Sequence, residues 1–152
     1  MYLPAIMAFL HHVAAFTLVT TLGVEVALFK PPLTAIQARR IIVTDTLFGI
    51  SATALLIVGL LRVFFYEKGA AYYFHDAFFV AKLSLFVIAA LISIYPTVLY
   101  LSWRKPLQRG VVPEVSDSQR KRARMCLMLE LTAVLGILLC APLMARGFGY
   151  FG

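Results

Sequence analysis

The stretch LPAIMAFLHHVAAFTLVTTLGVEVALF, residues 3–29, decides the fold class of this protein. It is apolar over almost its whole length and carries three ionisable side chains, His11, His12 and Glu25. A helix needs about 20 predominantly apolar residues to cross the roughly 30 Å hydrocarbon core of a bilayer. The stretch therefore predicts a membrane-spanning helix, and the two adjacent histidines inside it need a physical reason.

Three further apolar stretches follow, and the predicted spans are Leu3–Phe29, Ile41–Phe65, Phe74–Trp103 and Met125–Ala145. Hydrophobic residues make up 62% of the 152-residue chain and charged residues 14%, against about 45–50% and about 25% in soluble domains. Connections between consecutive spans are short, which favours antiparallel neighbours. We predict a single membrane domain, residues 1–152, that is all-α and forms an antiparallel four-transmembrane-helix bundle.

Basic residues are distributed unevenly among the connections. The first connection carries Lys30, Arg39 and Arg40 and the third carries seven more cations, whereas the second carries only Lys68. An excess of positive charge marks cytoplasmic loops, so we expect a multi-pass protein of the bacterial inner membrane with both termini outside. This distribution also explains the net charge of +7. The lipid bilayer, and not nucleic acid, is the expected partner.

Ionisable side chains at membrane depth are candidates for function, because placing them there is costly. They separate into two groups along the predicted spans. The acids Glu25, Asp45 and Glu130 fall in the cytoplasmic half. The outer half holds His11, His12, Arg62, His75 and Lys82.

A b-type haem is the cofactor that the outer group favours. Neutral imidazole is a good ligand for haem iron, so His11 and His12 are the candidate metal ligands. His11 is the first choice, and His12 points about 100° away from it on a helix. The sixth coordination position of the iron would be filled by His12, His75 or a group from a second protomer, or it would be left vacant. Binding would be non-covalent, because the sequence contains no CxxCH motif.

The remaining outer residues are assigned to the edge and walls of the haem. Arg62 and Lys68 are placed to pair with propionates, and Tyr72 or Tyr73 to donate hydrogen bonds. His75 and Lys82, seven positions apart, are expected to face the same way. Phenylalanines are candidates for the apolar walls: Phe16, Phe64, Phe65, Phe78 and Phe79.

The function predicted from these residues is electron transfer or haem-dependent oxidoreductase chemistry near the outer face, with a quinone or another small molecule as redox partner. One alternative is a cofactor-free, proton-coupled transporter in which Glu25, Asp45 and Glu130 line a vestibule and Lys82 closes the path. Another is an accessory subunit of a larger membrane complex. Each histidine could also serve packing alone, and Glu25 and Asp45 could pair with Arg39 or Arg40.

Small residues recur along two of the spans and let membrane helices approach closely. They predict a homodimer with two-fold symmetry, although the same residues could instead pack the interior of one bundle. On the first span they are Ala8, Ala15 and Gly23, and on the third Ala77, Ala81, Ala89 and Ala90.

Several stretches resemble known membrane families. The whole chain looks like an uncharacterised family of four-helix bacterial inner-membrane proteins, through LHH, GLLRVFF followed by EKGAAYY, and AKL. More distantly, Leu10-His11 and FVAKLSLFV around Lys82 resemble HemJ-type protoporphyrinogen oxidases and copper-resistance D-type membrane proteins. The HemJ resemblance implies haem b, with His11 as its ligand and Lys82 as a site residue.

Overall fold

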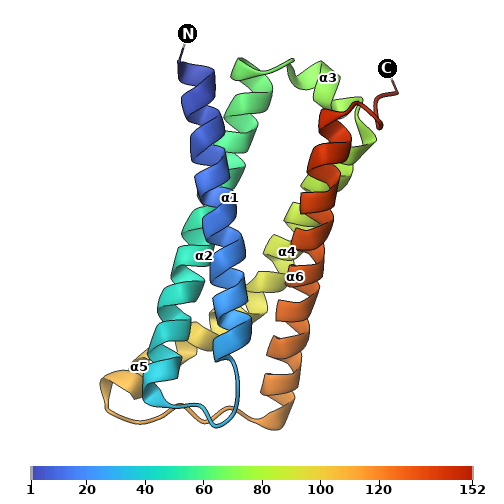
Figure 1. The fold of residues 1–152 in the computed structure, drawn as a ribbon. Helices are drawn as coiled ribbons and strands as arrows, with labels where there is room; N and C mark the ends of the chain where they lie inside the picture. The colour runs from blue at the N-terminus through green and yellow to red at the C-terminus, as the bar shows by residue number, and fades with distance from the viewer. Residues whose placement is uncertain (1, 152) are drawn as a thin grey trace.

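The computed structural model describes residues 2–151 and is built from helices (Figure 1). Four long helices form the bundle: α1 (Leu3–Leu28), α2 (Ala35–Leu61), α4 (Ala77–Ser102) and α6 (Asp117–Ala145). A π-helical segment, η1 (Arg62–Tyr66), continues α2, and two short helices, α3 (Ala70–Phe74) and α5 (Arg104–Gln108), lie in the connections. The four long helical segments are long and apolar enough to cross a membrane. The predicted all-α, four-span architecture is confirmed.

Two of the long helices begin earlier than the apolar pattern predicts. Thr34 caps α2 and Ser116 caps α6, each in a capping box completed by a glutamine three residues later. In a capping box, the two side chains satisfy backbone N–H groups that the first helical turn leaves unpaired. Both helices therefore extend through polar, basic residues before they reach the apolar span.

The four long helices are arranged as two hairpins, α1 with α2 and α4 with α6 (Figure 1). Both chain termini lie at one end of the bundle, which we call the termini end. The opposite end, which we call the loop end, holds residues 29–34 and 103–116. α4 slants across the bundle, so the hairpins meet at the loop end and diverge toward the termini end (Figure 1).

Aromatic side chains join the two hairpins at the loop end. Phe29, after α1, stacks on Trp103 with ring centroids 6.3 Å apart, and Tyr100 of α4 packs against both rings. Ile41 of α2 and Leu127 of α6 are buried in the same core. This contact closes the bundle at the loop end and leaves the divergent termini end for a site.

The start of α4 differs from the prediction that the third span begins at Phe74. Phe74 ends α3, and α4 begins at Ala77 because Asp76 caps it, accepting hydrogen bonds from the N–H groups of Phe78 (2.9 Å) and Phe79 (3.2 Å). His75 lies between the two helices. The expected common helical face of His75 and Lys82 therefore does not form.

The outer surface of the bundle is apolar. Many large hydrophobic side chains are exposed, including Phe9, Phe16, Leu91, Val98 and Leu139. Because soluble proteins rarely expose continuous apolar surface on this scale, these side chains are in contact with the lipid bilayer.

Candidate functional site

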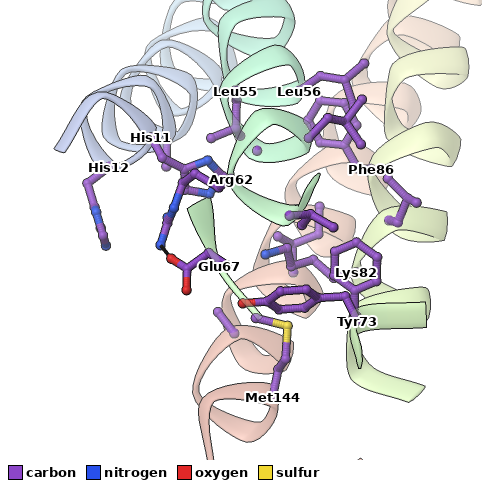
Figure 2. A pocket seen from close by; sticks show the side chains of 18 of the residues that line it. His11, His12, Leu55, Leu56, Arg62, Glu67, Tyr73, Lys82, Phe86 and Met144 are labelled. Atoms are coloured by element: carbon purple, nitrogen blue, oxygen red, sulfur yellow. Dashed lines mark hydrogen bonds and ion pairs between the residues drawn. The ribbon is translucent and has the colours of Figure 1, made fainter. Parts of the chain in front are cut away.

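A cleft of about 260 Å³ lies between the two hairpins at the termini end (Figure 2). All four long helices contribute to its walls, as do η1 and α3. Its walls are mainly aliphatic and aromatic, and its polar groups gather toward the termini end. Facing helices of a bundle commonly form cofactor sites in this way.

His11 of α1 lines the cleft and packs against Gly59 of α2. A Cβ atom at position 59 would lie 3.3 Å from Cε1 of His11, which is tighter than most real contacts. Nδ1 of His11 is buried and has no hydrogen-bond partner among residues 2–151. A buried polar atom without a partner is unusual in proteins, so this imidazole is a candidate ligand-binding group.

His12 lies at the rim of the same cleft, and its ring is exposed. Its Nδ1 is 2.6 Å from the carbonyl oxygen of Ala8, one turn earlier on α1. The two histidine rings are nearly perpendicular, with an interplanar angle of 88°. As the helical spacing predicts, the two imidazoles do not point at one spot (Figure 2).

Arg62 and Glu67 form an ion pair at the termini end of the cleft, with Nη2 and Oε1 2.6 Å apart. Arg62 opens the π-helical segment η1, and Glu67 follows its last residue. π-helical turns occur frequently at functional sites. Nε of Arg62 is buried without a partner among the described residues, so this guanidinium keeps an unused donor.

Lys82 and Tyr73 direct their polar atoms into the cleft from the other hairpin and from α3 (Figure 2). Lys82 makes no hydrogen bond or ion pair within the part of the chain that the structure describes. Tyr73 lies outside the membrane-spanning helices. Partial burial and the charge of Glu67 raise the pKa of its hydroxyl above the usual value of 10.0, so Tyr73 keeps its proton at neutral pH and can donate a hydrogen bond.

Three other predicted site residues, His75, Tyr72 and Lys68, lie outside this cleft. His75 has Nδ1 2.7 Å from the carbonyl oxygen of Ala71, and its ring packs against Phe151. Tyr72 stacks on Tyr150 with centroids 4.8 Å apart, and Nζ of Lys68 lies 4.4 Å above the Tyr72 ring. The cleft thus brings together His11, His12, Arg62, Tyr73 and Lys82.

Of the five phenylalanines predicted as apolar walls, Phe79 lines the cleft, whereas Phe16, Phe64, Phe65 and Phe78 do not. Phe16, Phe64 and Phe65 are 72%, 51% and 74% exposed and lie on the outer surface. Sequence reasoning missed Phe86, which follows Phe79 and Lys82 at helical spacing on α4 and lines the same wall. It also missed Gly59, three positions before Arg62, and Glu67 and Met144.

Protein side chains alone do not form a metal centre in the described part of the chain, because no three His, Cys, Asp or Glu groups converge there. Cys126 and Cys140 are free thiols, as expected from their spacing. A metal ion beside His11 would therefore take most of its ligands from a non-protein group such as a porphyrin.

The acids form a separate group near the loop end. Glu25, Asp45 and Glu130 are buried in the bundle. The predicted pairing of Glu25 or Asp45 with Arg39 or Arg40 does not occur, because the two ion pairs among residues 2–151 join other residues. Arg39 instead donates a hydrogen bond to the carbonyl oxygen of Leu107 at 3.2 Å.

Comparison with known proteins gives one family match. Residues 3–149 match the family described as "Predicted membrane protein (DUF2214)". No curated protein and no solved structure matches the chain. The match covers all four long helices and carries no assigned activity.

Proposed function

We propose, from the premise that the chain belongs to the DUF2214 family of predicted membrane proteins, that it binds haem b in this cleft and transfers electrons in the membrane. The observation that carries the proposal is His11. Its imidazole lines an apolar cleft between two hairpins and has a buried nitrogen without a protein partner.

The donor set of the cleft fits a haem. Neutral imidazole is a common axial ligand of haem iron, and His11 is the histidine that lies against the inner wall. His12 is at the rim and His75 is outside, so neither offers a second ligand from the same wall. Leu55 of α2 and Phe86 of α4 provide apolar surfaces from opposite hairpins for the two faces of a flat macrocycle.

The polar groups at the termini end fit the propionates of a haem. Lys82 has a free ammonium group in the cleft, and Arg62 keeps a buried Nε donor beside its ion pair with Glu67. Tyr73 adds a neutral hydroxyl donor. Charge-assisted hydrogen bonds from such groups to carboxylates are stronger than neutral ones, so they would fix the orientation of the haem.

The size of the cleft sets a condition on binding. Its volume of about 260 Å³ lies just under the usual range of ligand pockets, about 300–1,000 Å³. Haem binding therefore requires the hairpins to separate further at the termini end, where they already diverge (Figure 1). When bound, the haem would supply one-electron redox chemistry, and a quinone in the bilayer is the class of partner that reaches such a site.

The test is the visible spectrum of the protein purified in mild detergent after haem-supplemented expression. We expect a Soret band, and sharp α and β bands on reduction. His11→Ala should abolish the bands, whereas His75→Ala, whose ring lies outside the cleft, should keep them. A colourless wild-type protein, or a spectrum that His11→Ala leaves unchanged, would refute the proposal.

A further inference from the structure

A second polar group lies about 21 Å along α1 from His11, at roughly 1.5 Å per residue. Glu25 on α1, Asp45 on α2 and Glu130 on α6 are 2%, 6% and 1% exposed, and Tyr100 on α4 is 0% exposed. Leu22, Phe48 and Leu127, each about one helical turn from one of these carboxyl groups, belong to the same buried core as Tyr100, and the carboxyl groups act on the Tyr100 hydroxyl through space. We call these four residues the acid cluster.

Three atoms of the acid cluster are buried without a hydrogen-bond partner among residues 2–151: Oε1 of Glu25, Oε1 of Glu130 and the Tyr100 hydroxyl. Asp45 differs, because its Oδ1 accepts a hydrogen bond from the Thr97 hydroxyl at 2.8 Å. The Tyr100 ring packs on Phe29 and Trp103, which fixes the position of this side chain in the core. Unpartnered polar atoms at this depth indicate a site that takes up a small ligand.

No cation within the described residues pairs with these carboxyl groups, since the ion pairs there are Arg62–Glu67 and Arg120–Asp117. Arg104 on α5 acts on the Asp45 carboxyl group through space and forms no ion pair with it. The other titratable group near the acid cluster is Cys126, which lies beside Glu130 on α6. An unpaired buried charge is strongly unfavourable even after the surrounding protein relaxes. Three ionised carboxylates would also repel one another.

We propose that the acid cluster is a proton-binding site that exchanges protons with the aqueous phase at the loop end. A proton needs no cavity, and on binding to a carboxylate oxygen it removes a negative charge. The bound proton also lets that oxygen donate a hydrogen bond, whereas the ionised carboxylates of Glu25 and Glu130 can only accept one. A metal ion fits less well, because the described residues contain no group of three or more His, Cys, Asp or Glu side chains placed to hold one.

The loop end is the nearer aqueous phase for this exchange. Glu25 lies in the last turn of α1, where its carbonyl oxygen accepts a hydrogen bond from the N–H of Phe29 at 2.9 Å. The proton comes from water at that end and returns there, and no bond between heavy atoms changes. The acid cluster is separate from the cleft and does not depend on haem.

The experiment is infrared spectroscopy of the protein in lipid vesicles, in H₂O and D₂O, across a pH series. We expect a C=O band of protonated carboxyl groups at neutral pH, which shifts in D₂O and disappears reversibly as the pH rises. Glu25→Gln, Asp45→Asn and Glu130→Gln should each remove part of the band. Glu114→Gln is the matched control, because Glu114 is exposed in the loop, and it should leave the band unchanged.

Three results would overturn the proposal: no such band at neutral pH, a band that does not respond to D₂O, or a band that none of the three carboxyl variants reduces. If a carboxyl variant does not fold, Tyr100→Phe keeps the aromatic packing and should shift the band, and an unshifted band counts against the proposal. The haem proposal is read from visible absorption, so the two can fail independently.

Discussion

The imidazole of His11 occupies space that a side chain at position 59 would otherwise fill. We predict that Gly59→Val displaces this ring and lowers haem retention strongly, because a Cβ alone would already lie 3.3 Å from Cε1. The measurement is the ratio of Soret to protein absorbance. Gly49→Val on the same helix is the control, because a Cβ there meets no atom within 4 Å. Equal haem retention in the two variants would contradict this placement of His11.

Tyr73 provides a prediction about pH. Its pKa is raised in the folded protein, first by burial and then by the charge of Glu67. Above the ordinary pKa of 10.0, the unfolded chain releases this proton while the folded protein retains it, so the free energy of unfolding falls as the pH rises. We expect Tm to drop above about pH 10, and to drop less in Tyr73→Phe. An identical pH dependence in both proteins would exclude a contribution from Tyr73.

Some individual site residues were predictable from the sequence, because placing a polar or charged side chain inside the membrane is energetically costly and marks that residue as a candidate. His11, Arg62 and Lys82 stand out because charged or polar groups are rare in such apolar stretches, and all three line the cleft. The phenylalanines carry no such signal, because lipid-facing and cleft-facing rings are equally apolar. This is why Phe16 was placed wrongly and Phe86 was missed.

At the scale of secondary-structure elements, hydropathy determines some parts of the fold and not others. The apolar pattern predicts four spans, since only a helix satisfies its own backbone within lipid. It does not predict helix ends, which depend on caps such as Thr34 and Ser116. It also gives no indication of the π-helical segment Arg62–Tyr66, which sets the position of Glu67 relative to Arg62.

The beginning of α4 depends on one carboxylate. Asp76→Ala removes the acceptor for the N–H groups of Phe78 and Phe79, and loss of a helix cap costs about 0.5–2 kcal/mol. We expect a lower Tm and weaker haem binding, because Phe79 and Lys82 lie in the first turns of α4. Asp76→Asn keeps an oxygen acceptor and should retain most of the stability. If both variants have the same Tm, the cap does not position α4.

At the scale of the whole molecule, the cleft is complete within one chain, so a dimer is not required to form it. The homodimer stays a prediction. Gly23 is exposed and a Cβ atom there would meet no atom within 4 Å, so this position leaves room for a second copy against α1. Light scattering corrected for detergent should give twice the chain mass of 16.9 kDa. We expect Gly23→Leu to reduce this mass, and a monomeric wild-type protein would disprove the dimer.

The orientation of the bundle follows from where its charges lie. The structure places both termini at one end, and the connections rich in lysine and arginine at the other (Figure 1). Because basic loops remain in the cytoplasm, we predict that the loop end is cytoplasmic and the termini end is outside. Single cysteines in place of Glu114 and of Tyr150, in a chain whose Cys126 and Cys140 are replaced by serine, should differ in intact cells. A membrane-impermeant maleimide should label position 150 and spare position 114 until the cells are broken. The reverse pattern would place the cleft on the cytoplasmic side and the acid cluster on the outer side, so each site would face the opposite aqueous compartment.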